Sequence, residues 1–450
     1  MYTKKKMLTL FLVFVLVCSS VLIISNFYLN DNVSSDPDDS EPIDSDKDDS
    51  NKEAEDSKII KMINQVKRDS VYKYLSELVD IGVKPTRSEN CDRAAVYIYN
   101  KFKEMGLDVE YQEWKYPLLK GKNVIATLPG KDVESDAVFI VCAHYDTWKN
   151  TVGANDDASG IAAMLMVAEI MSKYSFNHTF RFIALSGHES PPFYTYGSTA
   201  YVRKAYRADE NIVGVLNLDM IGNTSKEGNV FQLHGTIRSE WLINFVNKIN
   251  EKYYDLFDVK IENFRSKPGA DESSFITYGY DAVLIIQSNF WEPPNHEPGD
   301  DISTINFDSL TNVTKMILAC AVNLADKRID LQVRITKPKE DYVYFFDRPV
   351  FRAPGLLNFK RFGLRSMTYI VGGITVKLDI RTDDEIKNVY FFLDDKITYK
   401  NVVSEPPFEF KIEKRKSLKD VIRGKHKIGV KVFTYSGLTA VDEIEVLFIP

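Results

Sequence analysis

Residues 137–160 read AVFIVCAHYDTWKNTVGANDDASG, and this stretch decides the fold of the first half of the chain. Residues 137–143 form an uninterrupted apolar run, which is typical of a strand buried on both faces of a sheet. His144 and Asp146 follow directly, and a loop then leads into residues 160–173, which we predict to be helical. The stretch therefore predicts a strand, a polar loop and a helix, the repeating unit of an α/β sheet.

The same alternation continues to about residue 328. Further apolar runs predict three more strands, and helical periodicity predicts helices before and between them. We therefore expect residues 58–330 to form one α/β domain, with a mostly parallel sheet and helices on both faces. The further strands are expected at 179–186, 211–218 and 281–288, and the helices at 92–105 and 239–252.

The pattern changes at about residue 331. Short segments of alternating polarity now dominate, such as ITVKLDI (374–380) and HKIGVKVFTY (426–435), separated by turn-rich links. This pattern predicts an all-β sandwich over residues 331–450. The segments also resemble the strands of bacterial and archaeal immunoglobulin-like modules, which implies spacing, adhesion or substrate presentation with no chemistry.

The N-terminus predicts export. Lys4, Lys5 and Lys6 precede an apolar run within residues 1–29, long enough to span a bilayer. No clear small-residue cleavage site follows, so an uncleaved signal-anchor is preferred over a cleaved signal peptide. The lysines are expected to remain in the cytoplasm. The rest of the chain is therefore expected outside, anchored to the membrane at the cell surface, or secreted if the segment is cleaved.

Residues 30–57 are rich in Asp and Ser and poor in apolar residues, so we predict a disordered acidic linker. Residues 31–57 hold twelve acidic residues and two lysines, a balance of −10, so the remainder of this chain of net charge −7 is close to +3. No basic patch indicates a nucleic-acid partner. Three cysteines remain beside the one in the apolar run, which does not indicate a disulfide framework. No pattern reveals the oligomeric state.

Histidine and acidic residues follow the predicted strands of the α/β domain. Open α/β sheets bind their ligands outside the carboxyl ends of the strands. A subset of two histidines and three carboxylates converging there would already be sufficient to hold metal ions. The residues in this relation are His144, Asp146, Asp156, His188, Glu189, Asp219 and His296, whereas His178, His234 and His426 lack it.

The motifs AHYDT (143–147), GANDDASG (153–160), NLDMIG (217–222) and NHEPGDD (295–301) are recognisable in type and order. They resemble those of the two-zinc aminopeptidases, the group that contains bacterial leucyl aminopeptidase and aminopeptidase Y, with glutamate carboxypeptidase as a relative. The resemblance covers about residues 70–328. It implies a metal-dependent exopeptidase that removes N-terminal residues from peptide or protein substrates outside the cytoplasm.

The resemblance also implies roles for individual residues. His144 and Asp219 would hold one divalent ion, Glu189 and His296 would hold a second, and Asp156 would bridge the two, with zinc as the expected metal. Asp146 would lie behind His144 and orient its imidazole. Asp271, in the motif GADESSF, would line the site on the substrate side.

One position departs from the family pattern. The family has two consecutive glutamates after this strand, the general base and then a metal ligand, whereas this chain has His188 and Glu189. We interpret His188 as the base and Glu189 as the ligand. Two alternatives stay open: a non-catalytic descendant that binds peptide amines, and an acyltransferase resembling glutaminyl cyclase with one zinc. The full set of five ligand candidates argues against the latter.

Overall fold

The computed structural model of the chain describes most of residues 49–449. Shorter and longer gaps interrupt the described part, most of them in the C-terminal region. These gaps are residues 118, 134, 192–193, 209, 224–227, 237–238, 266–268, 293, 328–330, 340–341, 353–367, 383, 395–401, 404–405, 413–423 and 436–437.

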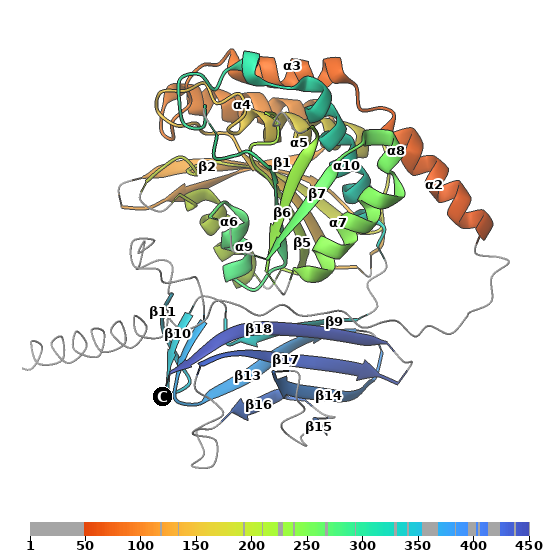
Figure 1. Cartoon of the computed structure of the whole chain (residues 1–450), viewed down its shortest axis with the longest axis vertical. Helices are drawn as coiled ribbons and strands as arrows, with labels where there is room; N and C mark the ends of the chain where they lie inside the picture. Colours follow the sequence, from red (N-terminus) through yellow and green to blue (C-terminus); the bar gives the residue numbers. More distant parts are fainter. Residues whose placement is uncertain are drawn as a thin grey trace, which may run out of the picture.

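The first domain is built on an eight-stranded sheet with the order β1-β2-β4-β3-β5-β8-β6-β7 (Figure 1). The central strands β4, β3, β5 and β8 are parallel. On one side β1 and β2 pair antiparallel with their neighbours, and on the other side β6 pairs antiparallel with β8 and parallel with β7. The strands are β1 Asp108–Lys115, β2 Lys120–Leu128, β3 Val138–His144, β4 Thr179–Leu185, β5 Ile212–Leu218, β6 Val230–Gly235, β7 Lys260–Arg265 and β8 Ala282–Gln287.

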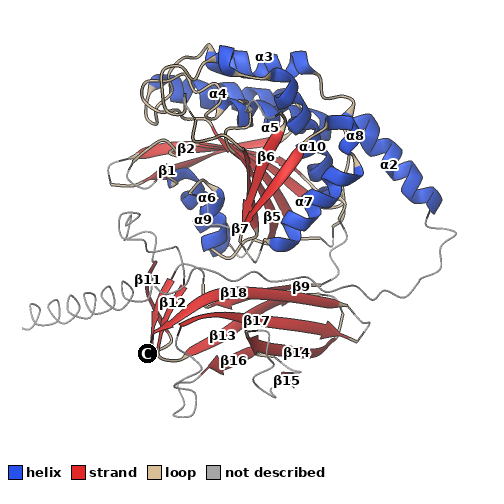
Figure 2. Ribbon diagram, viewed as in Figure 1, coloured by secondary structure: helices blue, strands red, loops and turns tan. Residues whose placement is uncertain are grey.

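Helices cover both faces of this sheet (Figure 2). On one face, α5 is buried along almost its whole length, because it lies between the sheet and the outer helices α3 and α10. On the other face, Val202 of α6 and Phe275 of α9 pack against Ile140 and Ile183 of the sheet. The helices are α2 Asp49–Ile63, α3 Arg68–Val79, α4 Glu89–Glu104, α5 Ala158–Met171, α6 Tyr196–Arg207, α7 Glu240–Lys252, α8 Tyr254–Phe257, α9 Glu272–Thr277, the 3-10 helix η1 Ile302–Thr304 and α10 Phe307–Ala325.

The predicted fold class is confirmed. The four predicted strands are β3, β4, β5 and β8, each within one residue of its predicted ends. The predicted helices 92–105 and 160–173 start two or three residues later than α4 and α5, because the prediction did not use their N-caps, whereas 239–252 agrees with α7 within one residue. Ser88 accepts a hydrogen bond from the N–H of Cys91, and Asp157 accepts one from the N–H of Gly160, which sets the true starts of α4 and α5.

The N-terminal part of the described chain differs from the prediction. Helix α2 takes up residues 49–57 of the predicted linker, because Glu, Ala and Lys favour helix and because Ile59, Met62 and Ile63 join the hydrophobic core. The rest of the linker and the predicted signal-anchor over residues 1–29 lie outside the described residues. Among the described residues, no helix combines the length and the apolar character needed to cross a bilayer.

The C-terminal region is all-β, as predicted. A seven-stranded sheet (β11-β10-β12-β18-β17-β14-β15) and a three-stranded sheet (β16-β13-β9) share a core that contains Val376, Phe391 and Val430. Burial alternates along the strands, as in β18, because only one face of each sheet points inward. The strands are β9 Gln332–Lys337, β10 Tyr342–Phe345, β11 Arg348–Arg352, β12 Thr368–Val371, β13 Ile374–Arg381, β14 Ile386–Leu393, β15 Val402–Val403, β16 Glu409–Ile412, β17 Gly424–Thr434 and β18 Thr439–Ile449.

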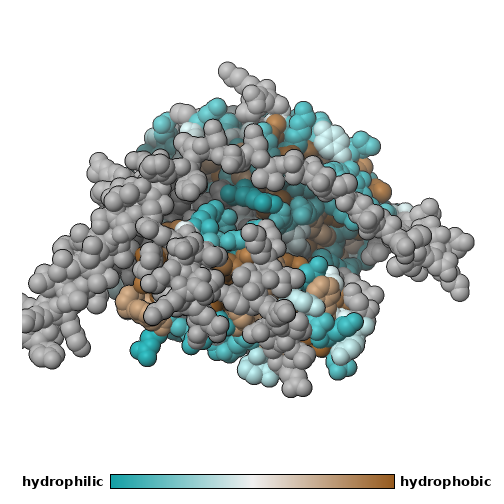
Figure 3. All heavy atoms as spheres, turned by 60° about the horizontal axis from the view of Figure 1, so that its bottom comes forward, coloured by the Kyte–Doolittle hydropathy of each residue, from teal (hydrophilic) through white to brown (hydrophobic). Residues whose placement is uncertain are grey.

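The sandwich contacts the α/β domain at the amino ends of the central strands. Arg334 of β9 donates to the carbonyl oxygen of Ile212, the first residue of β5, at 3.0 Å. Arg381 of β13 forms an ion pair of 2.9 Å with Asp136, which lies just before β3. Hydrophobic residues are visible between hydrophilic ones at the sandwich end of the molecule (Figure 3). The carboxyl ends of the same strands, where the polar motifs lie, are at the opposite edge of the sheet.

Candidate metal centre

The polar motifs meet at the carboxyl edge of the sheet. His144 is the last residue of β3, Glu189 lies four residues beyond β4, and Asp219 follows β5 directly. His296 lies in the loop after β8. Because β4, β3, β5 and β8 are parallel neighbours, all these positions lie at one edge of the sheet. The structure thus brings together the five residues that the resemblance implies as metal ligands.

The first group of ligand atoms surrounds His144. Its Nδ1 bonds to the carbonyl oxygen of Asp146 at 2.9 Å, which places the ring proton on Nδ1. Its Nε2 lies 3.0 Å from Oδ1 of Asp156 and 3.8 Å from Oδ1 of Asp219. A nitrogen lone pair that faces carboxylate oxygens is a contact between acceptors. It becomes favourable when a proton on Nε2 or a metal ion lies between the atoms.

The second group surrounds His296. Its Nε2 lies 3.2 Å from Oδ2 of Asp156 and 3.0 Å from Oε1 of Glu189. The second oxygen of Glu189, Oε2, is buried and has no hydrogen-bond partner among the described residues. The indole of Trp148 stacks on the His296 ring at 5.0 Å, which limits the orientations open to that imidazole.

Asp156 is common to both groups. Its Oδ1 faces His144 and its Oδ2 faces His296. Imidazole nitrogen and carboxylate oxygen are ordinary zinc ligands, and a bridging carboxylate can give one oxygen to each of two ions. Nε2 of His144 is buried and satisfies no hydrogen-bond geometry among the described residues, as expected for an atom that coordinates a metal. The donor set therefore fits zinc.

The electrostatics of the centre favour positive charge. Burial disfavours a charged His144, but the carboxylates of Asp156 and Asp219 outweigh burial and raise the pKa of His144 well above its ordinary value. Contacts with Asp156 and Glu189 raise the pKa of His296 to about 10. Burial, together with the charge of Asp156, raises the pKa of Glu189. The clustered negative charge of the centre therefore favours a cation at these residues.

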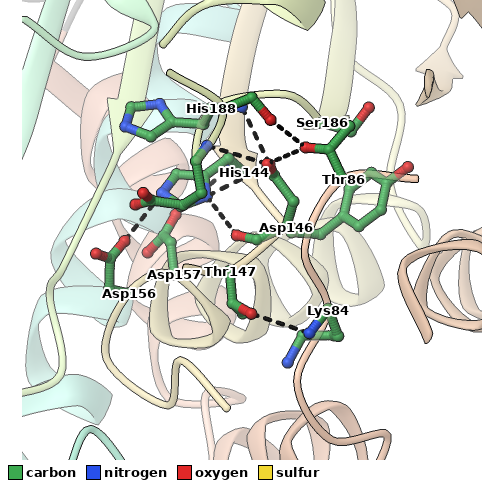
Figure 4. A network of polar contacts seen from close by, with 12 residues as sticks. Lys84, Thr86, His144, Asp146, Thr147, Asp156, Asp157, Ser186 and His188 are labelled. Atoms are coloured by element: carbon green, nitrogen blue, oxygen red, sulfur yellow. Dashed lines mark hydrogen bonds and ion pairs between the residues drawn. The ribbon is translucent and has the colours of Figure 1, made fainter. Parts of the chain in front are cut away.

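Asp146 lies behind this centre, and its backbone carbonyl group and its side-chain carboxylate make separate contacts. Its carbonyl group accepts the His144 hydrogen bond, whereas its carboxylate Oδ1 is 3.8 Å from that imidazole. The carboxylate instead accepts the N–H groups of His188 at 3.2 Å and Glu189 at 3.0 Å, and the hydroxyl of Thr86 at 2.6 Å (Figure 4). The side chain therefore fixes the loop after β4, while the main chain orients the imidazole.

Two further aspartates position the loop that carries Asp156, and the sequence interpretation gave neither a role. Oδ1 of Asp157 accepts the N–H groups of Gly160 at 3.0 Å and Met220 at 3.1 Å. The carboxylate of Asp300 accepts the N–H groups of Asn155 and Asp156. Asp157 follows the motif aspartate and precedes a helix, which is an N-cap signal. Asp300 carries no comparable local signal.

His188 and Asp271 lie beside the first group. Nδ1 of His188 is 3.1 Å from Oδ2 of Asp271, and its Nε2 is 3.9 Å from Oδ2 of Asp219. The His188 ring stacks on that of His144, with 4.0 Å between centroids and 6° between planes. The remaining histidines are engaged elsewhere: His178 contacts Ser135, His234 stacks on Phe264, and His426 pairs with Asp394.

Comparisons with known proteins agree with this geometry. Residues 123–321 match the sequence profile of peptidase family M28. The chain is 23% identical over 341 residues to a probable zinc metalloprotease of Pyrenophora tritici-repentis, a match that covers 60% of this chain and 77% of that protein. It is also 23% identical over 294 residues to leucine aminopeptidase 1 of Ajellomyces capsulatus, covering 59% and 73% of the two chains.

A solved structure shares the α/β fold. The LapA aminopeptidase of Legionella pneumophila superposes with a TM-score of 0.55 at 20% identity, covering 61% of this chain and 76% of that chain. The matched profile spans strands β3, β4, β5 and β8 and with them every residue of the two ligand groups. The core of the α/β domain, residues 123–321, therefore matches peptidase family M28.

Proposed function

We propose that this chain is a zinc-dependent aminopeptidase that holds two zinc ions, which share Asp156. One observation carries the proposal: the two oxygens of the Asp156 carboxylate face two different histidines, Oδ1 at 3.0 Å from His144 and Oδ2 at 3.2 Å from His296. Asp219 would complete the set around His144, and Glu189 would complete the set around His296. The named zinc peptidases among its relatives support hydrolysis as the reaction.

Zinc and the residues around it would have different roles in hydrolysis. When bound, zinc supplies Lewis acidity for the scissile carbonyl group and the attacking water. Nε2 of His188 would accept a proton from that water and pass it to the leaving amine. The Asp146 carboxylate holds the backbone of His188 and Glu189, so that base and ligand keep a fixed spacing.

An alternative assignment moves both roles one residue along the chain, so that Glu189 is the base and Ser190 the ligand. We call it the rival assignment. The structure supports our assignment over this rival. Ser190 donates its hydroxyl to Thr86 at 2.7 Å, on the Asp146 side of the loop, whereas Oε1 of Glu189 lies 3.0 Å from His296. Serine is also a poor zinc ligand.

A second candidate function is the binding of peptide amines without hydrolysis. The observation that favours it is His188, which stands where the resemblance implies a glutamate. The same ligand groups would still hold zinc in such a protein. The two candidates therefore differ in turnover and not in metal content.

The test is hydrolysis of a panel of aminoacyl-anilides by the purified, zinc-loaded chain. Removal of the metal with a chelator should abolish hydrolysis, and added zinc should restore it. The matched N-acetylated anilides should not be cleaved, because an aminopeptidase requires a free α-amine. Full zinc content without cleavage of any member of the panel would reject the aminopeptidase and favour the binding protein.

We further propose that the catalytic domain is anchored at the outer surface of the membrane. Lys4, Lys5 and Lys6 followed by an apolar run support this topology. Protease added to intact cells should release a soluble fragment by cleavage within the acidic segment 31–48. A chain that is fully protected from the protease would contradict the topology.

A further inference from the structure

We propose that Asp271 is a positioning residue for His188: it fixes the proton of the imidazole on Nδ1, so that Nε2 faces the metal centre as an acceptor without coordinating an ion. This inference rests on the proposed function and assigns Asp271 to the base rather than to the substrate. His188 makes two contacts that define its role, one with Asp271 and one with His144.

The Asp271 carboxylate is held on both oxygens. It lies just before α9 and is 2% exposed. Its Oδ2 is 3.1 Å from Nδ1 of His188, and its Oδ1 accepts the hydroxyl of Ser198, from α6, at 2.5 Å. Ser198 in turn lies 2.9 Å from the hydroxyl of Ser274 on α9. The carboxylate is therefore fixed between two helices and cannot turn away from the imidazole.

This contact determines the tautomer of His188. A carboxylate can only accept a hydrogen bond, so Nδ1 must donate the proton in the contact. In the neutral ring, Nε2 then carries the lone pair, and it is the nitrogen that faces Asp219, at 3.9 Å. A histidine that binds a metal is often held by a carboxylate in this way, so the contact alone allows His188 to be either a ligand or a base.

The stacking of His188 on His144 argues against His188 as a ligand of the ion at His144. Their rings are nearly parallel, at 6°, with centroids 4.0 Å apart. Ring atoms in contact remain roughly 3.5 Å apart, so the two planes are separated by about that distance. A zinc ion lies near the plane of an imidazole ligand, about 2.0–2.1 Å from its nitrogen. An ion in the plane of His144 is therefore too far from Nε2 of His188 to be coordinated by both rings.

The same arrangement suits a base. Nε2 of His188 points to the metal-ligand side of the site, whereas the Asp271 carboxylate contacts the other ring nitrogen, where it would stabilise positive charge on the ring.

Nuclear magnetic resonance of the full chain, labelled with ¹⁵N-histidine and loaded with cadmium-113, tests the assignment. The chain has six histidines, and a His188→Gln variant identifies the His188 signals. We expect His188 to be protonated on Nδ1, with an Nε2 that is not coupled to cadmium, while His144 and His296 show that coupling. Cadmium coupling at His188, or a proton on its Nε2, would overturn the proposal whether or not the protein hydrolyses peptides.

The variant Asp271→Asn tests the consequence. We expect kcat to fall by about 10²-fold or more, the range of general-base catalysis, with KM and zinc content unchanged. The His188 signals should also shift, because the amide can donate to Nδ1. Glu272→Gln is the matched control, since Glu272 is the next buried carboxyl group and bonds to Asn217 instead. Loss of zinc from Asp271→Asn, or an unchanged His188 spectrum, would contradict the proposal.

Discussion

Asp300 holds the main chain of Asp156: its Oδ2 accepts the Asp156 N–H at 3.1 Å, and its Oδ1 accepts the neighbouring N–H of Asn155 at 2.7 Å. Asp300 is 1% exposed and belongs to the loop that also carries His296. The loop that supplies one proposed ligand therefore positions the carboxylate that would bridge both ions. The two ligand groups are thus linked by the hydrogen bonds of Asp300 to the main chain at Asn155 and Asp156.

Removal of this connection should weaken metal binding. Asp300→Ala should lower zinc affinity about 10- to 100-fold, the usual cost of losing a residue that supports a metal ligand. Competition with a chromophoric chelator measures the change. Asp301→Ala is the control, because the Asp301 side chain bonds to Ser303 at 2.8 Å and 2.6 Å. Equal zinc affinity in the two variants would show that Asp300 does not position Asp156.

The neighbouring residues His188 and Glu189 should separate metal binding from catalysis. Glu189→Gln should reduce zinc content, because Oε1 loses its charge beside His296. His188→Gln should keep the zinc and lower kcat by about 10²- to 10⁴-fold, as expected on loss of a general base. His188→Glu should keep or raise activity. If Glu189→Gln binds as much zinc as the wild type, the rival assignment with Ser190 as ligand is favoured.

Glu272 predicts a pH dependence of stability. Burial raises the pKa of Glu272 to about 8, whereas the unfolded carboxyl group ionises near its ordinary pKa of 4.5. Between these values the folded state binds one more proton than the unfolded state, so the free energy of unfolding falls with rising pH, by at most about 1.4 kcal/mol per pH unit. The stabilisation is complete below pH 4.5 and lost above about pH 8.

Glu272→Gln should remove this contribution. The Tm of the wild type should therefore fall more steeply than that of the variant between pH 5 and 8.5, measured by calorimetry in one set of buffers. Other groups titrate equally in both proteins and cancel in the comparison. A constant difference in Tm over this range would show that Glu272 ionises normally in the folded state.

The sandwich should not be needed for metal binding. Its contacts through Arg334 and Arg381 lie at the amino ends of β5 and β3, at the edge of the sheet away from the metal centre. Deletion of residues 331–450 should therefore leave the zinc content unchanged, as measured by elemental analysis. A soluble, folded product without zinc would show that the sandwich helps to complete the metal centre.

Much of this site could be predicted from the sequence, because the carboxyl ends of neighbouring parallel strands lie at the same edge of a sheet. Buried strands read as apolar runs, so the polar residue that follows each run, such as His144 or Asp219, could be placed at one edge of the sheet. The carboxylate groups that hold the backbone were harder to predict. Asp300 resembles any acidic loop residue, and Ser198 approaches Asp271 only because α6 and α9 pack together. Whether Asp146 bonds His144 through its carbonyl group or its carboxylate depends on local backbone geometry that no sequence pattern specifies.

The most direct test of the account is the zinc stoichiometry of the full chain and of Asp156→Ala. Both proteins are stripped of metal, loaded with excess zinc, freed of unbound ions and measured by elemental analysis. Because Asp156 faces both His144 and His296, the wild type should hold two ions per chain and Asp156→Ala should lose both. A single ion per chain that survives the Asp156→Ala substitution would contradict the shared site.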